Sequence, residues 1–343
     1  MFFYARVFLR HFYGSPLPEA PEFDDDDRAP MEPFLREAVD RVRAGDWRAG
    51  RKLVEDAGAD WDVRDWRISA LAGMAAEDDR WLYAWLRAEP ADPAAVLIQA
   101  MLLHRQAAEA RGSASAARTS AEQFQNFRAL SDAAAQVGRR AMALAGPYDP
   151  VPWSTMLGTM FADRQAVATS FDEVFAEGRR RDPYNFDLHL TATTLKCEKW
   201  YGSHDEMFGI ARGVAAAAPP GHKSVLLPLF AHFEYAMREF SWDERTKRSR
   251  NRCKKYFRRP EVQHELDQWI AKFRAGSPGA GPLSHCRQWM AVYYSLIERK
   301  KEAKAVFDEL GQFPDPTTEW NYFWGDREWG YLQNWWWANG VRP

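Results

Sequence analysis

Apolar side chains recur at helical spacing along almost the whole chain. After Pro33, apolar residues return at every third or fourth position up to Gly45, and a similar pattern follows Pro93 as far as Gly112. This period places apolar side chains on one face of an α-helix, whereas the alternation typical of strands is absent from the interior of the sequence. The sequence therefore predicts an all-α fold.

Turn and capping residues divide this pattern into separate helices. We expect one helix to begin at Pro33 and end at Gly45, because proline suits the first turn and glycine the end of a helix. The carboxylate of Asp46 can cap the next helix, which is expected to end at Gly58. Further helices are expected over 81–86, from Pro93 to Arg111 and from Ser120 to Gly146, with a polar loop over 112–119.

Proline pairs recur between the expected helices at an interval close to that of tetratricopeptide repeats. Two consecutive intervals in the middle of the chain are 33 and 37 residues. Tetratricopeptide repeats are two-helix units of about 34 residues that end at a proline. The sequence therefore predicts a tetratricopeptide-like solenoid of helical hairpins, with an irregular bundle of the same hairpins as the alternative. The pairs are Asp92-Pro93, Asp149-Pro150, Asp182-Pro183, Pro219-Pro220 and Asp315-Pro316.

Composition shifts along the chain indicate four segments. The N-terminal segment begins with an alternating apolar pattern over 3–9, which suits a short strand, an extended arm or a first helix. A proline-rich linker follows and contains the acidic run Asp24 to Asp27. The expected segments are an arm and acidic linker over 1–30, helical hairpins over 31–146, tetratricopeptide-like repeats with a basic helix over 147–275, and C-terminal helices with an aromatic cap over 276–343.

Bulk composition indicates a soluble, unexported chain with a sizeable core. The chain has 343 residues, of which 46% are hydrophobic, and its net charge of −2 excludes a globally basic nucleic-acid binder. Arg6 and Arg10 interrupt the apolar N-terminus, so we expect no signal peptide. The chain has three cysteines, which lie far apart: Cys197, Cys253 and Cys286. An odd number of widely spaced cysteines is typical of inert buried thiols in a reducing compartment. A cytoplasmic location is therefore expected.

A short motif follows the helix expected over 186–200. It has the form Trp-x-Gly-Ser-x-x-Glu-Met and is followed by Ala-Arg. This motif resembles an uncharacterised bacterial family, the domain of unknown function numbered 4034. The resemblance covers a short part of the chain, implies helical repeats in a bacterial cytosol, and brings no activity with it. The matching residues are Trp200, Gly202, Ser203, Glu206, Met207, Ala211 and Arg212.

Local physical chemistry accounts for this motif without a reaction. Gly202 is expected to adopt a left-handed backbone at the end of one helix, and Ser203 to cap the next helix in a capping box with Glu206. Trp200 is expected to pack against the turn, and Met207 to begin an apolar face. The motif is therefore interpreted as structural, with a binding role for Trp200, Tyr201 or His204 as the alternative.

Catalytic and metal-binding patterns are incomplete in this sequence. Gly221-His222-Lys223-Ser224 has the end of a phosphate-binding loop but lacks its earlier glycine, and His264-Glu265 begins a zinc motif in which Gln268 replaces the second histidine. No catalytic residue, cofactor or metal site is therefore predicted. The alternative is an enzyme whose site is assembled in a helical cavity from scattered residues such as His189, His232, Glu234 and Tyr235.

Nine basic residues are concentrated between Glu244 and Arg259. Ser241 and Glu244 have capping spacing, so we expect one helix from there, with Tyr256 and Phe257 on its apolar side. The face is either solvated and neutralised by the acidic run at 24–27, or it binds an acidic protein or nucleic acid. The candidate partner-binding residues are Arg245, Arg248, Arg250, Arg252, Lys254 and Lys255.

Nine aromatic residues lie between Trp320 and Trp337. They are interpreted as a hydrophobic cap on the last repeat, with a ligand or partner surface and a membrane contact as alternatives. Taken with the basic helix and the repeat-like spacing, the sequence favours a protein-interaction scaffold that binds a protein or peptide through a helical groove.

Overall fold

The structure is a computed structural model that describes residues 18–24, 31–112, 119–242 and 246–341. Within these ranges it contains 17 α-helices and two short 3₁₀ helices, Met160–Ala162 and Lys223–Leu226, and no strand. The all-α prediction is confirmed, whereas the pattern over 3–9 lies outside the described residues. None of the helices in these ranges is long and apolar enough to cross a lipid bilayer.

The helices group into two compact units. The N-terminal unit comprises residues 31–224 together with the short segment 279–282. The described part of the C-terminal unit comprises 18–24, 225–242, 246–278 and 283–341. The division after residue 224 falls inside the expected segment 147–275.

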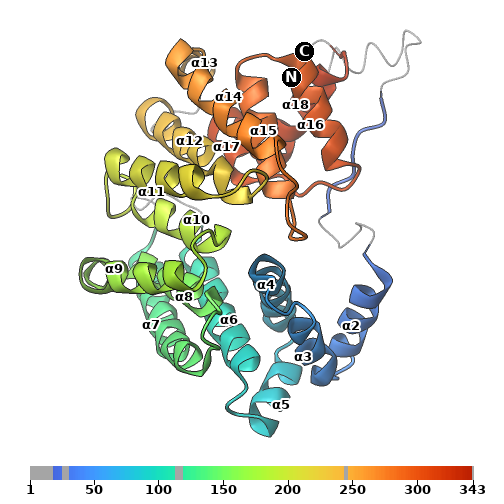
Figure 1. Cartoon of the computed structure of the whole chain (residues 1–343), viewed down its shortest axis with the longest axis vertical. Helices are drawn as coiled ribbons and strands as arrows, with labels where there is room; N and C mark the ends of the chain where they lie inside the picture. Colours follow the sequence, from blue (N-terminus) through green and yellow to red (C-terminus); the bar gives the residue numbers. More distant parts are fainter. Residues whose placement is uncertain (1–17, 25–30, 113–118, 243–245, 342–343) are drawn as a thin grey trace. The chain divides into compact units, whose positions relative to one another are not determined.

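Ten helices lie within the described residues of the N-terminal unit. Several successive helices pack together, such as α2 with α3, α6 with α7 and α10 with α11 (Figure 1). The helices are α2 (Pro33–Arg43), α3 (Trp47–Glu55), α4 (Trp61–Glu77), α5 (Arg80–Ala88), α6 (Pro93–Arg111), α7 (Ala121–Leu144), α8 (Val151–Thr159), α9 (Arg164–Arg181), α10 (Phe186–Leu195) and α11 (His204–Ala217).

Capping residues set several of these boundaries where the sequence predicts them. Asp46 accepts a hydrogen bond from the backbone of Arg48 at 3.2 Å and so starts α3. Ser120 forms a full capping box with Gln123 at the start of α7. Helix α4 was not among the expected elements, although Asp60 caps it in the same way.

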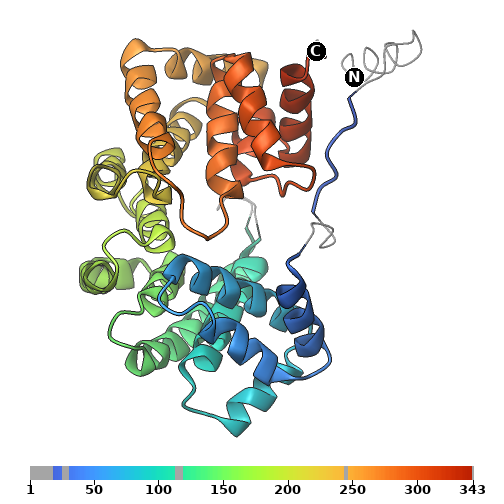
Figure 2. The ribbon, with the colours of Figure 1, turned by 45° about the vertical axis from the view of Figure 1, so that its right-hand side comes forward.

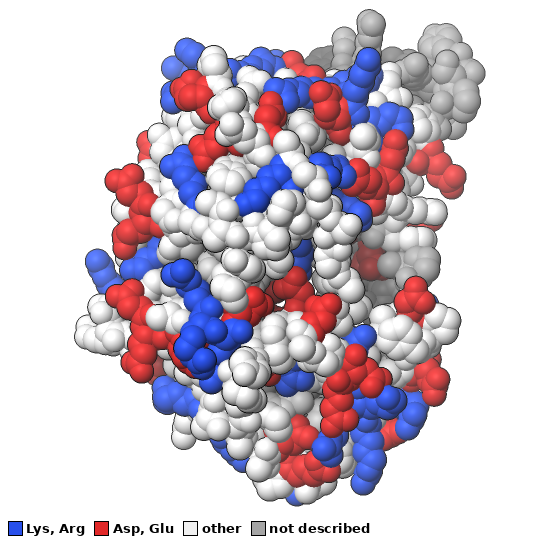
Figure 3. Space-filling view, viewed as in Figure 1, with Lys and Arg blue, Asp and Glu red and all other residues white. Residues whose placement is uncertain are grey.

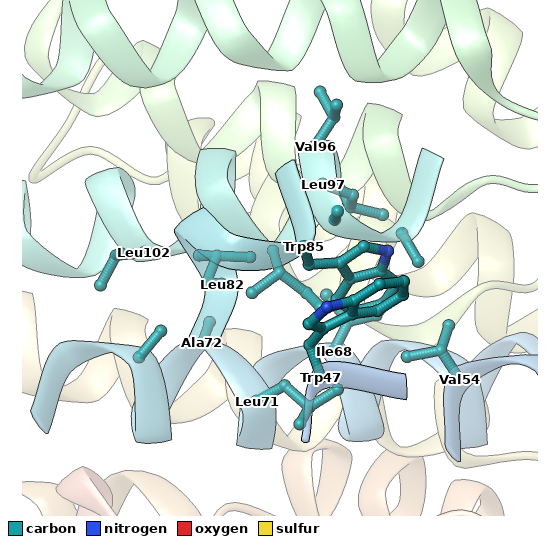
Figure 4. Packing of buried hydrophobic residues seen from close by; sticks show 14 of the residues in the cluster. Trp47, Val54, Ile68, Leu71, Ala72, Leu82, Trp85, Val96, Leu97 and Leu102 are labelled. Carbon is teal, nitrogen blue, oxygen red and sulfur yellow. The ribbon is translucent and has the colours of Figure 1, made fainter. Parts of the chain in front are cut away.

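Stacked tryptophans hold helices α3 to α6 together (Figure 4). The ring of Trp47 on α3 lies 5.6 Å from that of Trp85 on α5, at an interplanar angle of 15°. Ile68 and Leu71 on α4 and Leu82 on α5 are fully buried in the same cluster. Full burial of one large apolar side chain stabilises a fold by about 1.5–3 kcal/mol, so this cluster fixes α4 within the unit.

The described part of the C-terminal unit contains seven helices. Helices α15 and α16 lie side by side, as do α17 and α18 (Figures 1 and 2). The helices are α12 (Leu227–Phe240), α13 (Lys247–Phe257), α14 (Pro260–Arg274), α15 (Ser284–Leu296), α16 (Lys300–Leu310), α17 (Thr318–Trp324) and α18 (Arg327–Ala338).

The aromatic C-terminal segment supplies part of the core of this unit. Trp320 is fully buried, with its ring 5.9 Å from Phe307 and 5.6 Å from Tyr331. Phe323 packs against Phe257 with ring centres 6.0 Å apart. By contrast, four tryptophans of α18 remain partly exposed: Trp329, Trp335, Trp336 and Trp337. One part of the aromatic run therefore stabilises the fold, and the other part faces outward.

Candidate functional site: the basic face of helix α13

Helix α13 begins later than the sequence predicts. Its start is capped by Thr246, which forms a capping box with Ser249 through hydrogen bonds of 2.9 and 3.2 Å. The expected cap, Ser241, is instead the buried residue that ends α12, and its hydroxyl donates to the carbonyl of Tyr322 at 3.1 Å. That prediction was wrong because the preceding helix uses Ser241 at its own end. Glu244 and Arg245 lie outside the described residues.

Buried side chains fix the rotation of α13 about its axis. Cys253, Tyr256 and Phe257 are all buried, and Phe257 packs edge-on against Phe323. The hydroxyl of Tyr256 lies 2.6 Å from Nδ1 of the buried His232. The sequence correctly places Tyr256 and Phe257 on the apolar side. The opposite face of α13 is therefore held toward solvent.

Three exposed cations follow one line along that outer face, and a fourth lies just beyond the end of the helix. Arg248, Arg252 and Lys255 are separated by four and three residues, a spacing that aligns side chains on one side of a helix, and the exposed Arg259 follows at the extended residue before α14. We call these four residues the basic stripe. The guanidinium of Arg252 donates to the carbonyl of Phe240 at 2.9 Å, and that of Arg259 lies 5.2 Å from the ring centre of Tyr256. Among the described residues, no carboxylate forms an ion pair with any of the four.

Two neighbouring cations are neutralised within the chain. Glu298 lies 2.9 Å from Nζ of Lys254 and 2.7 Å from the guanidinium of Arg258. The hydrogen bond from Lys254 is the main reason that the pKa of Glu298 is lowered. Part of the basic helix is thus paired in cis, and the described partner is Glu298. Three members of the acidic run suggested by the sequence, at 25–27, lie outside the described residues.

Arg250 lies between the outer and inner faces of α13. Burial lowers the pKa of its guanidinium, because a charged group loses favourable hydration when it leaves water. Its buried Nε atom has no hydrogen-bond partner within the described part of the chain. The structure therefore divides the six candidate residues: Arg248, Arg252 and Lys255 are exposed, Lys254 is paired, Arg250 is half-buried, and Arg245 is not described.

The family motif forms a tight turn between α10 and α11. Ser203 caps α11 by accepting from the backbone of Glu206 at 3.2 Å, as predicted. In place of the expected capping box, the Ser203 hydroxyl donates to the Glu206 carboxylate, which also lies 3.2 Å from Nζ of Lys196. The left-handed backbone expected at Gly202 is wrong, since its φ is not positive. Glycine is required there because a Cβ would lie 2.3 Å from the carbonyl oxygen of Lys196.

The remaining motif residues pack within the N-terminal unit. Helix α10 ends at Leu195, earlier than expected, and the turn that follows carries Trp200. The ring of Trp200 lies 4.8 Å from Phe161 and 5.3 Å from the guanidinium of Arg111. As predicted, Met207 is fully buried on α11. The guanidinium of Arg212 lies over the ring of Phe208 at 4.4 Å. These contacts agree with a structural role for the motif.

The structure partly groups the residues suggested for an enzymatic site. His232, Glu234 and Tyr235 lie on α12, where the His232 ring contacts Tyr256 and Tyr235 stacks on Tyr256 with ring centres 5.0 Å apart. The hydroxyl of Tyr322 donates to Glu234 at 2.7 Å.

His189 belongs to the N-terminal unit, on α10, where its Nδ1 lies 2.9 Å from the carbonyl of Asn185. Burial lowers the pKa of His189 to about 4, so this ring is neutral at pH 7. At the incomplete zinc motif, the side chain of Gln268 bonds to Nε2 of His264 at 2.9 Å, the position where a second histidine would be needed.

Sequence reasoning missed a buried charged cluster in the N-terminal unit. Asp62 and Asp65 on α4 meet Asp187 on α10 and Lys223, and the Nζ atom of Lys223 lies 3.1 Å from Asp62. Asp65 is only 6% exposed. The available signal was the pair Asp62 and Asp65, which share one helix face at a spacing of three residues.

Comparison with known proteins gives no relative for this chain. No protein-family model matches it, and no match was found among the curated proteins or the solved structures. Its activity is therefore inferred from its own residues.

Proposed function

We propose that the protein is a protein-interaction scaffold that binds an acidic segment of a partner protein through the basic stripe of α13. The observation that carries the proposal is the alignment of Arg248, Arg252 and Lys255 on an exposed face whose rotation is fixed by buried aromatic residues. The exposed Arg259 adds a fourth positive charge just beyond the end of the helix. Four cations without a carboxylate partner in the described part of the chain favour an anionic ligand.

The size and surroundings of the stripe favour a short acidic peptide over nucleic acid. Eleven residues of helix span about 17 Å, which matches an extended acidic segment of about five residues. Lys and Arg atoms on the face that includes α13 alternate with acidic atoms (Figure 3). Glu298 pairs with Lys254 and Arg258 and so shortens the unpaired positive surface, which suits a short anionic segment better than a continuous phosphate backbone.

We also propose that the helices form tetratricopeptide-like hairpins, and pairs of packed successive helices support this arrangement. We further propose that the chain belongs to the bacterial family suggested by the Trp200 motif and that it lies in the cytoplasm. Cysteines that are buried and form no disulfide support a reducing compartment, and this holds for Cys197, Cys253 and Cys286.

The test compares two variants that each lose four positive charges. One carries Ala at Arg248, Arg252, Lys255 and Arg259. The matched control carries Ala at four exposed helical cations elsewhere: Arg36, Arg87, Arg139 and Lys301. Fluorescence anisotropy with a labelled glutamate-rich peptide should show tight binding to the wild type and the control, and at least a tenfold loss in the stripe variant.

Two further measurements decide between partners. Single-stranded DNA of the same charge and label should bind more weakly than the peptide at each salt concentration, and tighter DNA binding would establish the nucleic-acid alternative instead. Affinity purification from native cytosol with the same three proteins should then recover a partner that is lost only with the stripe variant and contains an acidic run. Equal peptide binding by both variants would refute the proposal.

A further inference from the structure

Glu298 has a backbone conformation that residues with a side chain rarely adopt. It lies in the turn after α15, and its φ of 63° is the one positive φ of a non-glycine residue among the described residues. The left-handed region is crowded for every residue with a Cβ, so such a residue persists only where its surroundings hold it there. Backbone strain of this kind concentrates at functional positions.

The hydrogen bonds of this turn form a Schellman motif, in which glycine is the usual left-handed residue. The backbone N–H of Arg299 donates to the carbonyl of Tyr294 at 2.9 Å, and that of Glu298 donates to the carbonyl of Ser295 at 3.4 Å. The end of α2 has the same pair of bonds, and there Gly45 takes the left-handed position with a φ of 95°. Glycine therefore suits the turn after α15 equally well, and the backbone gives no reason for a glutamate.

The Glu298 side chain, by contrast, bridges two cations at the C-terminal end of α13. Its Oε1 lies 2.9 Å from Nζ of Lys254, and its Oε2 lies 2.7 Å from the guanidinium of Arg258. These two cations are four residues apart, so they lie on the same side of the helix. Each is followed in the sequence by a member of the basic stripe, Lys255 or Arg259. Lys254 and Arg258 thus form an anion subsite beside the stripe, and the chain fills it with its own carboxylate.

We propose that Glu298 is a built-in competitor of the acidic partner, and that a carboxylate of the partner displaces it from Lys254 and Arg258. This inference rests on the proposed function, because it assigns a second subsite to the same acidic ligand. In the free protein, Glu298 fills the subsite and lowers the affinity for acidic segments. In the complex, its side chain turns into water and both cations contact the partner.

The contacts of this turn allow the carboxylate to leave while the backbone stays in place. Arg299 anchors the turn to α14, where its guanidinium donates to Asp267 at 2.8 Å and to Gln263 at 2.9 Å. The Glu298 side chain is 51% exposed, so a change of rotamer is enough to move its carboxylate into water. Ion pairs at such exposed positions contribute little to stability, so a carboxylate of a partner can replace this one.

The test measures binding of the labelled glutamate-rich peptide by fluorescence anisotropy at about 0.1 M salt. Glu298→Gln should bind the peptide about three- to tenfold more tightly than the wild type, because both cations become available. Glu298→Gly also removes the backbone strain, so it should show the same gain in affinity together with a higher midpoint in urea unfolding. The matched control Glu302→Gln removes one negative charge at an exposed position of α16 and should bind as the wild type does.

A second set of variants identifies the cations that the partner gains. Replacing Lys254 and Arg258 with alanine should weaken peptide binding several times more in the Glu298→Gln background than in the wild type, where Glu298 already occupies both cations. Equal losses in the two backgrounds would show that Glu298 acts only as a nearby negative charge, and would overturn the proposal.

The outcomes separate this inference from the proposed function. Peptide binding that is lost in the stripe variant but unchanged in Glu298→Gln would leave the proposed function standing and refute the competitor. Equal binding by the wild type and the stripe variant would refute the proposed function and this inference with it. Absence of binding from both the wild type and Glu298→Gln would also refute both, whereas binding that appears only after Glu298 is replaced would establish complete autoinhibition.

Discussion

Replacing Gly202 with alanine should destabilise the protein, because the turn between α10 and α11 has no room for a methyl group. The added Cβ would lie 2.3 Å from the carbonyl oxygen of Lys196 and 2.7 Å from its carbonyl carbon. Favourable non-bonded separations are about 3.5 Å, so the turn has to open by roughly 1 Å. Since both neighbours are backbone atoms, no side chain can move aside. Such overpacking typically costs about 1–3 kcal/mol.

A second glycine in the same segment provides a control of opposite sign. Gly213 lies in α11 at an exposed position, and a Cβ there meets nothing within 4 Å. Alanine is favoured over glycine inside a helix by about 0.5–1 kcal/mol, so Gly213→Ala should stabilise the protein.

Urea unfolding followed by far-ultraviolet circular dichroism measures both effects on the full chain. The midpoint should fall for Gly202→Ala and rise for Gly213→Ala. A midpoint for Gly202→Ala equal to or above that of the wild type would show that the turn accepts a side chain. The steric explanation of this motif would then be refuted.

Three other perturbations probe the core, the thiols and the basic helix. Trp85→Ala should lower the free energy of unfolding, measured by urea titration, by about 3–5 kcal/mol, because it opens a cavity beside Trp47. The control Trp66→Ala, at an exposed site, should change this free energy by less than about 0.5 kcal/mol. Burial raises the pKa of Cys253 to about 12, so mass spectrometry after iodoacetamide at pH 7.5 should find this thiol unmodified until urea is added. Glu298→Gln should strengthen binding of the glutamate-rich peptide in anisotropy assays, because it releases the charges of Lys254 and Arg258.

Local signals predicted the helices of this protein better than its contacts. Helix boundaries at Pro33, Asp46 and Ser120 were predictable because capping depends on residues within one turn. Helix α4 was missed because Asp65 and Arg67 occupy buried positions and disrupt its apolar face.

The same limit applies to the candidate sites. The rotation of α13 followed from Tyr256 and Phe257, which are adjacent in the sequence. Glu298, however, reaches Lys254 from 44 residues away, and Asp187 reaches Asp65 from another helix. No sequence spacing encodes such pairs, since tertiary packing alone brings them together.

The placement of residues 279–282 in the N-terminal unit affects how this chain emerges from a ribosome. Residues 31–224 leave the ribosome before residues 279–282, the segment that covers Asp62 and Lys223, because residues 225–278 are synthesised in between. At about 5–20 residues per second, that interval lasts several seconds. During synthesis the N-terminal unit therefore passes through a nascent form in which this ion pair is uncovered. Translation speed over 225–278 consequently sets the lifetime of that form.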